Sequence, residues 1–226
     1  MSFGEAPIGE GWCEQELRSE LPDLALLAVQ VRLAEDCSPR SRPPVELAAR
    51  LRDLANGWRG ARVVALRKQP VPSAYRAFYR QVGLDPDSTR TAIEELVLAR
   101  MIAGDFRSSG LLADALALAL LDTSVPVWAV DAETIDGPLG VRPSRKDELI
   151  ERGSKHAVLG GGRLVVADAE RAVALLFDQP QRPHRATRST RLLSLYAIEV
   201  AGVPRLCVEE ALSICAAALA DRGLSA

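Results

Sequence analysis

The residue pattern changes character near Val125, and this change constrains the fold more than any other feature of the sequence. Before it, most apolar residues recur at helical spacing, whereas after it short apolar runs alternate with turn residues such as Asp136-Gly137. The predicted helices are 45–56, 73–82, 93–103 and 108–121, with a closing helix at 208–221, and the predicted strands are 24–33, 126–131, 138–142, 163–167, 171–178 and 190–201. Helices gathered before strands indicate the α+β class and not a regularly alternating α/β fold.

The segment 108–121 predicts a buried helix. It is apolar on nearly every side and carries one charged residue, Asp114. A helix of this kind is usually covered by other elements around most of its circumference. We therefore expect it to pack against the strands that hold Val127 and Val165.

Composition limits the classes of protein to which the chain can belong. Its 226 residues, 48% of them hydrophobic, can bury a sizeable core as about one large domain. A formal net charge of −2 excludes an overall positive field, so any contact with RNA must come from a local basic patch. The N-terminus lacks the pattern of a signal peptide, and the longest apolar run is too short to span a bilayer. These features predict a soluble cytoplasmic protein without a membrane segment.

The sequence contains no pattern for a metal site or a bound cofactor. No two of its four cysteines form a Cys-x-x-Cys pair, and neither His156 nor His184 has a Cys or His at ligand spacing. We expect reduced cysteines, no metal and no cofactor. The run Gly160-Gly161-Gly162 lacks the Lys and Ser/Thr of a phosphate loop and predicts a tight turn. No catalytic side chain is predicted, since no nucleophile and base stand at a recognisable spacing.

The densest basic segment is RPHRATRSTR, which holds Arg182, Arg185, Arg188 and Arg191. Arginines in such a segment can contact the phosphate groups of RNA. Pro183 and the short polar residues are equally typical of a solvated loop that leads into a strand. The sequence leaves both interpretations open.

A tight corner around Gly137 places three charged residues close together, namely Asp131, Asp136 and Arg142. Asp136 needs no function, because an Asp-Gly pair is common in backbone turns. Asp131 follows an apolar strand, where it can cap a turn or form the wall of a substrate pocket. The turn cap is the simpler interpretation, and the pocket wall is the alternative.

Four segments in a fixed order resemble one known family. They are SAYRAFYRQVGLDP, TRTAIEEL, VPVWAVDAETIDGPLGVR and GGRLVVAD, with Asp114 between the second and the third. This series is similar to the B3/B4 domain, the tRNA-binding and editing module of the phenylalanyl-tRNA synthetase beta subunit, and especially to stand-alone proteins of this domain. The resemblance covers about 73–201, with 1–72 as an N-terminal strand-and-helix extension and 202–226 as a C-terminal helix of one domain over 1–226.

The resemblance implies a three-layer α+β fold with helices packed outside the sheets. It also implies hydrolysis of mischarged tRNA, for which a water held by backbone groups and the terminal ribose hydroxyl can replace a side-chain nucleophile. Two positions depart from the family: Trp128 stands where the family has His, and Ala117 where it has Asn. Asp114 and Asp131 match acidic positions of the family.

The resemblance also places a substrate pocket between the strand 126–131, the helix bearing Asp114 and the late strand bearing Glu199. Its expected residues are Asp114, Trp128, Asp131, Arg142 and Glu199, of which Asp114 or Glu199 would bind the amine of an aminoacyl group. We expect a stand-alone editing-like domain whose partner is tRNA or aminoacyl-tRNA. The alternative is a non-catalytic module that binds a small molecule or a protein through the same pocket.

Overall fold

The computed structural model describes residues 7–58, 60–106, 108–152 and 155–220. The helices are α1 (Gln15–Glu20), α2 (Val45–Gly57), α3 (Gly60–Ala65), α4 (Pro70–Gln81), α5 (Ala92–Ala103), α6 (Leu111–Thr123) and α7 (Arg205–Ala220). The strands are β1 (Gly9–Glu10), β2 (Trp12–Cys13), β3 (Ala25–Arg32), β4 (Val127–Asp131), β5 (Gly140–Pro143), β6 (Leu149–Arg152), β7 (Lys155–Val158), β8 (Leu164–Ala167), β9 (Ala172–Leu175) and β10 (Leu192–Glu199). The α+β class predicted from the sequence is confirmed.

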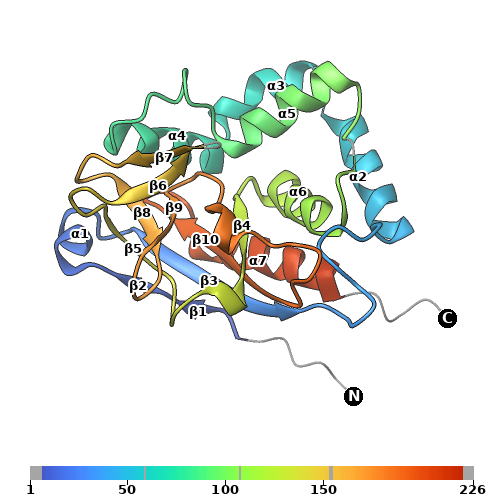
Figure 1. The fold of residues 1–226 in the computed structure, drawn as a ribbon. Coiled ribbons are helices and arrows are strands. Elements are labelled where there is room, and N and C mark those ends of the chain that lie inside the picture. Colours follow the sequence, from blue (N-terminus) through green and yellow to red (C-terminus); the bar gives the residue numbers. More distant parts are fainter. Residues whose placement is uncertain (1–6, 59, 107, 153–154, 221–226) are drawn as a thin grey trace.

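Each predicted helix and strand exists, and most bounds agree within a few residues. The elements that the sequence did not predict are short or lack a clear period: α1, α3, β1, β2 and the hairpin of β6 and β7. Figure 1 shows the strands in the left and lower part of the view, with helices α2–α5 arching across the top and right.

The strands form two four-stranded sheets and a separate two-stranded ribbon within the described residues. Sheet A has the order β1-β3-β10-β4 and is antiparallel throughout. Sheet B has the order β2-β5-β8-β9, in which only the pair β2 and β5 is parallel. Sheet A brings β3, β4 and β10 together from distant parts of the chain, so it connects the N-terminal third to the C-terminal strand.

Sheet A has two different faces. Side chains alternate along a strand, so Trp128 and Tyr196, which pair across β4 and β10, share one face. That face meets Phe177, which follows β9 of sheet B. Helix α7 packs against β3 and β10, and Glu199 on the opposite face contacts Arg205 of this helix. The layers are therefore helices α6 and α7, sheet A and sheet B.

Helix α6 is buried as its pattern predicted, but its neighbours differ in part. Its buried residues include Leu111, Leu118 and Leu121, and it packs mainly against α7 and α2. It also contacts β4, the strand that holds Val127, as expected. The expected contact with the strand of Val165 is wrong, because Val165 lies in sheet B within a second apolar cluster. Helix α7, and not the strand of Val165, is the neighbour that packs against α6.

The start of α5 is fixed by a carboxylate that accepts several hydrogen bonds. Glu94 Oε2 accepts from the backbone N–H of Thr91 at 3.1 Å and from its hydroxyl at 3.0 Å, and the first of these is the reciprocal bond of a capping box. Glu94 Oε1 accepts from Arg76 of α4 at 2.8 Å and from Arg67 at 2.7 Å. Because Arg76 and Glu94 are both buried, this ion pair positions α5 against α4.

Replacing Leu118 by Ala is expected to lower the free energy of unfolding by about 2–5 kcal/mol, because its side chain is 3% exposed in the core. Leu206→Ala on α7 is the matched control, since Leu206 is 73% exposed and its loss should cost less than about 0.5 kcal/mol. Urea unfolding of both variants measures the difference. Equal losses in the two variants would contradict the burial of α6.

Candidate functional site

A cluster of aromatic rings surrounds Phe177 at the junction of α4, β4 and the end of β9. Phe177 stacks on Tyr79 with 4.9 Å between ring centroids, and it meets the edges of Tyr75 and Phe78 at 6.0 and 5.8 Å. Trp128 lies 5.9 Å away at a tilted angle. Aromatic pairs in these geometries contribute about 0.5–1.5 kcal/mol each beyond the burial of their area. Phe177 therefore joins α4 to both sheets.

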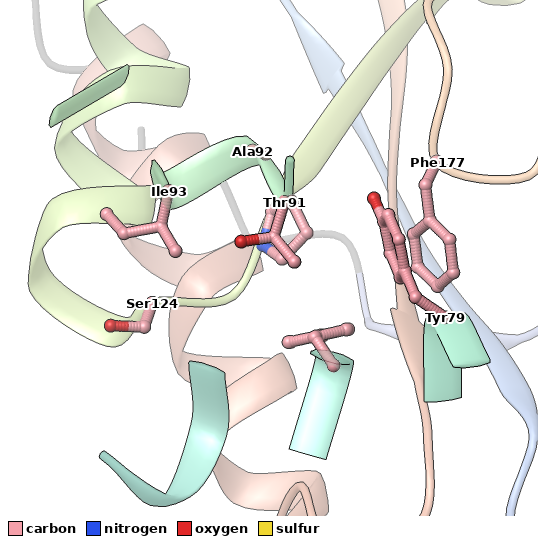
Figure 2. Close-up of a pocket in the computed structure, with 8 residues that line it drawn as sticks. Tyr79, Thr91, Ala92, Ile93, Ser124 and Phe177 are labelled. Carbon is pink, nitrogen blue, oxygen red and sulfur yellow. The ribbon is translucent and has the colours of Figure 1, made fainter. Parts of the chain in front are cut away.

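A narrow recess opens beside this cluster (Figure 2). Its lining residues are Tyr75, Tyr79, Thr91, Ala92, Ile93, Ser124, Pro126 and Phe177. Figure 2 shows the stacked rings of Tyr79 and Phe177 on one side and the start of α5 on the other. The cavity volume of about 10 Å³ is enough for about one water molecule. The recess combines apolar walls with hydroxyl groups, and these can orient a small polar group.

Two residues of the recess have a left-handed backbone. Ser124 has φ of 63° and Phe177 has φ of 65°, a region that residues other than glycine seldom adopt. Such strain persists only where surrounding contacts hold it, and it is concentrated at binding sites. The rings around Phe177 and the bond from the Ser124 N–H to the Leu120 carbonyl are those contacts. The recess is thus a built feature and one that the sequence pattern did not predict.

The structure does not bring the five predicted pocket residues together. Trp128 lies on the face of sheet A toward the aromatic cluster and stacks on Tyr196 at 5.7 Å. Asp131 and Glu199 lie on the opposite face, because each is three residues away from one of these rings along its strand. They also lie at opposite ends of β10, since Asp131 pairs with Leu193 and Glu199 pairs with Ala25. The single pocket expected between these elements is therefore not formed.

Asp131 caps a turn, which was the simpler interpretation of the sequence. Its Oδ1 accepts from the Glu133 N–H at 3.1 Å, and its Oδ2 accepts from the Thr190 hydroxyl at 2.5 Å. Asp114 is buried at the start of α6, where Oδ1 accepts from the Ser109 N–H at 3.1 Å. Its Oδ2 is buried without a hydrogen-bond partner among the described residues. A role for either residue in substrate binding stays a prediction.

Arg142 of β5 forms an ion pair with Glu148, which precedes β6; their side chains are 5% and 12% exposed. Its guanidinium donates to both carboxylate oxygens of Glu148, at 2.6 and 2.8 Å, in the bidentate geometry that suits arginine. Glu148 also accepts from the backbone N–H groups of Arg145 and Ala172. The hydrogen bonds from Arg142 hold the pKa of Glu148 below its ordinary value. Arg142 is thus fully engaged within the protein, and its predicted contact with substrate stays untested.

The corner around Gly137 is organised by Asp168, a residue that was not among the predicted site residues. Asp168 accepts from the backbone N–H groups of Asp136, Glu170 and Arg171 at 3.2, 2.9 and 2.8 Å. Burial alone would raise the pKa of this carboxyl, but the three N–H donors outweigh it and lower the pKa. Asp136 therefore contributes its backbone to this corner, and Asp168 contributes the carboxylate.

Glu199 lies at the other end of the sheet, in a cluster of charges around Arg205. Arg205 contacts Glu199 at 3.7 Å, Glu10 at 2.8 Å and Glu209 at 3.2 Å. Burial raises the pKa of Glu199, against the lowering effect of Arg205. The neighbouring residue Ile198 accepts through its carbonyl from the Tyr75 hydroxyl at 2.8 Å, so Glu199 lies at the recess end of β10.

The predicted basic segment forms the loop before β10. Arg185 donates to the Pro180 carbonyl, and Arg191 donates to the carbonyls of Arg188 and Thr190. Among the described residues, none of these three arginines has a carboxylate within ion-pair distance. The bond from Thr190 to Asp131 and the contact of His184 with Thr134 fasten the loop to the end of β4. The loop thus presents cations from a fixed position.

Two further arginines lie at the same end of sheet A. Arg32 is the last residue of β3 and pairs with Leu192, the first residue of β10. Arg40 lies in the loop after β3, which packs so closely on the start of α6 that a Cβ on Gly110 would lie 3.1 Å from the Arg40 Cα. Both side chains are exposed, and neither has a carboxylate partner in the described part of the chain. These arginines and the predicted segment together form a basic end, defined as Arg32, Arg40, Arg182, Arg185, Arg188 and Arg191.

The basic end and the recess occupy opposite ends of β4. Only residues 124–126 connect the end of α6 to the start of β4. The bond from Thr190 to Asp131 places the loop before β10 at the end of β4, whereas Ser124 and Pro126, before its start, line the recess. Figure 1 shows the loops after β3 and before β10 near each other at one end of the sheet. The separation along β4 is about 17 Å, at about 3.3 Å per residue.

No group of three or more His, Cys, Asp or Glu side chains that could hold a metal ion occurs in the part of the chain that the structure describes. All four cysteines are free thiols, and two of them, Cys37 and Cys215, are buried. No described helix is long and apolar enough to cross a membrane. His156 lies in β7, where the structure does not describe its side chain.

Comparison with known proteins finds no matching family model but does find related sequences. The phenylalanine–tRNA ligase beta subunit of Xylella fastidiosa (strain Temecula1) is 36% identical over 94 residues, which are 41% of this chain and 12% of the relative. The same subunit of Xanthomonas axonopodis pv. citri (strain 306) is 34% identical over 110 residues, which are 48% of this chain and 14% of the relative. This chain is therefore similar over about half its length to a tRNA ligase subunit, and it spans only about an eighth of that subunit.

One solved structure shows a partial likeness. It is an N-terminal fragment of the phenylalanyl-tRNA synthetase beta subunit from Pyrococcus horikoshii, with a TM-score of 0.42 and 18% sequence identity. The match covers 51% of this chain and 40% of the fragment. The sequence relation to the ligase subunits is the finding on which the functional proposal rests.

The stability contribution of the Arg142–Glu148 pair is expected to depend on pH. Because the folded state lowers the pKa of Glu148, the ionised form stabilises the fold above the ordinary carboxyl range of about 4.3, and this stabilisation is lost as pH falls through the folded pKa. Wild type should therefore exceed Glu148→Gln in unfolding free energy at neutral pH, with a smaller difference at about pH 3. Urea unfolding at both pH values measures this. Glu133→Gln, at an exposed position, is the control. A difference that stays constant between the two pH values would contradict the assignment.

Proposed function

We propose that this chain is an editing-like domain that binds aminoacyl-tRNA and hydrolyses mischarged tRNA in trans. The observation that carries the proposal is the similarity to phenylalanine–tRNA ligase beta subunits over 94–110 residues. The B3/B4 resemblance of segments such as VPVWAVDAETIDGPLGVR supports the same activity. A tRNA substrate would place the protein in the cytoplasm, in agreement with the sequence prediction.

The basic end supplies the expected contact with RNA. A chain with a net charge of −2 needs a local cationic patch to hold a polyanion, and arginines without carboxylate partners keep their charge available to phosphates. Arg185, Arg188 and Arg191 come from the predicted segment, and Arg32 and Arg40 extend the patch onto the neighbouring loop and strand. Phosphate contacts of this kind position a nucleic acid without reading its sequence.

The recess is the proposed position of the attacking water, and the scissile ester would lie at its mouth. Thr91, Ser124 and Tyr79 carry hydroxyl groups on its walls, and its volume accepts about one water molecule. An oriented water is what ester hydrolysis requires when no side-chain nucleophile takes part. A strand with one phosphate per about 3.4 Å would span the 17 Å from the basic end to the recess with about five nucleotides.

The alternative function is a non-catalytic module that binds a small molecule or a protein. The specific observation in its favour is Trp128, which stands at the family's His position and is occupied in stacking on Tyr196. A ring buried in this way cannot hydrogen-bond a substrate as His does. The two functions differ in one measurable property, since only the editing-like domain hydrolyses an aminoacyl ester.

Deacylation of a panel of mischarged tRNAs by the purified protein is expected for at least one member of the panel. Ser124→Gly removes a recess hydroxyl and suits the left-handed backbone at this position, so it should slow hydrolysis without unfolding the chain. Tyr79→Phe keeps the stacked ring and removes the Tyr79 hydroxyl. Each variant loses one hydrogen bond, which contributes about 0.5–1.5 kcal/mol, so hydrolysis should be up to about tenfold slower.

The results of the panel distinguish the editing-like domain from the binding module. If both recess variants hydrolyse the tRNA as fast as wild type, the protein has the activity but its site is not the recess. An absence of hydrolysis across the whole panel would reject the editing-like function. In that case a rise in melting temperature with a free ligand would support the binding module.

Neutralising two arginines of the basic end is expected to weaken tRNA binding and its salt dependence. The double variant Arg185→Gln/Arg188→Gln should reduce the slope of log affinity against log salt by roughly 1.4–1.8, the effect of two lost phosphate contacts. The control Lys68→Gln/Arg80→Gln removes the same charge from exposed positions on the α4 side. Filter-binding titrations at several salt concentrations give the slopes. An identical slope in the two double variants would place the RNA contact elsewhere.

A further inference from the structure

A groove of ligand size lies away from both the recess and the basic end. It is formed where α1, the end of α4, and strands β8 and β9 meet. Its cavity volume is about 370 Å³, which falls in the range of about 300–1,000 Å³ that is usual for small-molecule sites. The recess, at about 10 Å³, is far smaller. The groove is therefore large enough for a small-molecule ligand, whereas the recess is not.

The floor of the groove is apolar. Leu17 and Leu21 line it from α1 and its end, Val82 from the end of α4, and Leu164 from β8. All four belong to the core or pack against it, so the floor is a firm surface. An apolar body laid on it would lose contact with water, at a gain of about 25 cal/mol per Å² of buried apolar area.

The groove has one acidic and one basic side chain on its walls. Glu20 is the last residue of α1, and Arg163 follows the glycine turn that leads into β8. Both are exposed, and neither forms an ion pair with a described residue. They are therefore more than 4.0 Å apart at their charged atoms, which is the limit for an ion pair. A cation and an anion that do not pair with each other can receive the two ends of one zwitterion.

The glycine turn leaves space for such a ligand. A Cβ added to Gly161 would meet no atom within 4 Å, and Gly162 adopts a left-handed backbone with φ of +86°. The turn is fixed by the bond from the Gly162 N–H to the Ser144 carbonyl at 3.2 Å. Arg163 is thereby held at the mouth of the groove, with its own N–H bound to the Ser144 hydroxyl at 3.0 Å.

We propose that this groove binds a small zwitterion with an apolar body, of the size of an apolar amino acid or dipeptide. The ligand's ammonium group binds the Glu20 carboxylate, its carboxylate binds the Arg163 guanidinium, and its apolar side chains lie on Leu17, Leu21 and Val82. The site is independent of the proposed tRNA hydrolysis, since it shares no lining residue with the recess or the basic end.

Isothermal titration calorimetry of the full chain with L-leucine and with the dipeptide Leu-Leu tests the proposal. Binding is expected for at least one of them, and the tighter of the two identifies the size class. N-acetyl-leucine and leucinamide each lack one charge and should bind at least about tenfold more weakly, as expected for the loss of one charge-assisted hydrogen bond. No heat of binding for either zwitterion at millimolar concentration would overturn the proposal.

Variants assign each charge to its partner. Glu20→Gln should weaken binding of the zwitterion about tenfold, and this variant should bind leucine and N-acetyl-leucine equally well. Arg163→Gln should also weaken binding of the zwitterion about tenfold, and it should bind leucine and leucinamide equally well. Both positions are exposed, so these variants should fold normally. Glu16→Gln, one turn earlier on α1 and outside the groove, is the matched control. Binding that neither Glu20→Gln nor Arg163→Gln weakens would reject this groove as the site.

Discussion

Strand β10 is hydrogen-bonded along its whole length to β3 and over five residues to β4, and the rest of the structure depends on this pairing. The register places Tyr196 opposite Trp128, so that their stacked rings meet Phe177 and join sheet A to sheet B. Because side chains alternate, the same register directs Glu199 toward α7. A shift of one residue would exchange the two faces and separate the aromatic rings.

The same strands also fix the distance between the two proposed parts of the RNA-binding site. The loop before β10 lies at the end of β4, and Ser124, in the connection between α6 and the start of β4, lies at the recess. The bond between Asp131 and Thr190 fastens the basic loop at its end. The loop that carries the arginines is thereby held about 17 Å from the recess, at about 3.3 Å per strand residue.

Buried carboxylates hold the corners of this protein. Glu94 accepts hydrogen bonds from the start of α5 and from two arginines. Glu148 accepts from Arg142 and from two backbone N–H groups. Asp168 accepts from three backbone N–H groups. Each buried charge is therefore compensated by several donors, which limits the cost of removing it from water. Asp114 differs, because one of its buried oxygens has no partner among the described residues.

The sequence by itself determined the α+β class and the helices with an apolar period, because spacing is a local property of the chain. It missed β1 and β2, since two residues cannot show a period, and the β6–β7 hairpin, whose Leu149 and Val158 are exposed. The tertiary structure alone decided which predicted site residues meet. Because side chains alternate along a strand, Trp128 lies on one face of sheet A, and Asp131 and Glu199 lie on the other. The pair of Arg32 and Leu192, which are 160 residues apart in the sequence, brings Arg32 beside the segment before β10. Such contacts depend on register and layer packing, and no local pattern of residues records either.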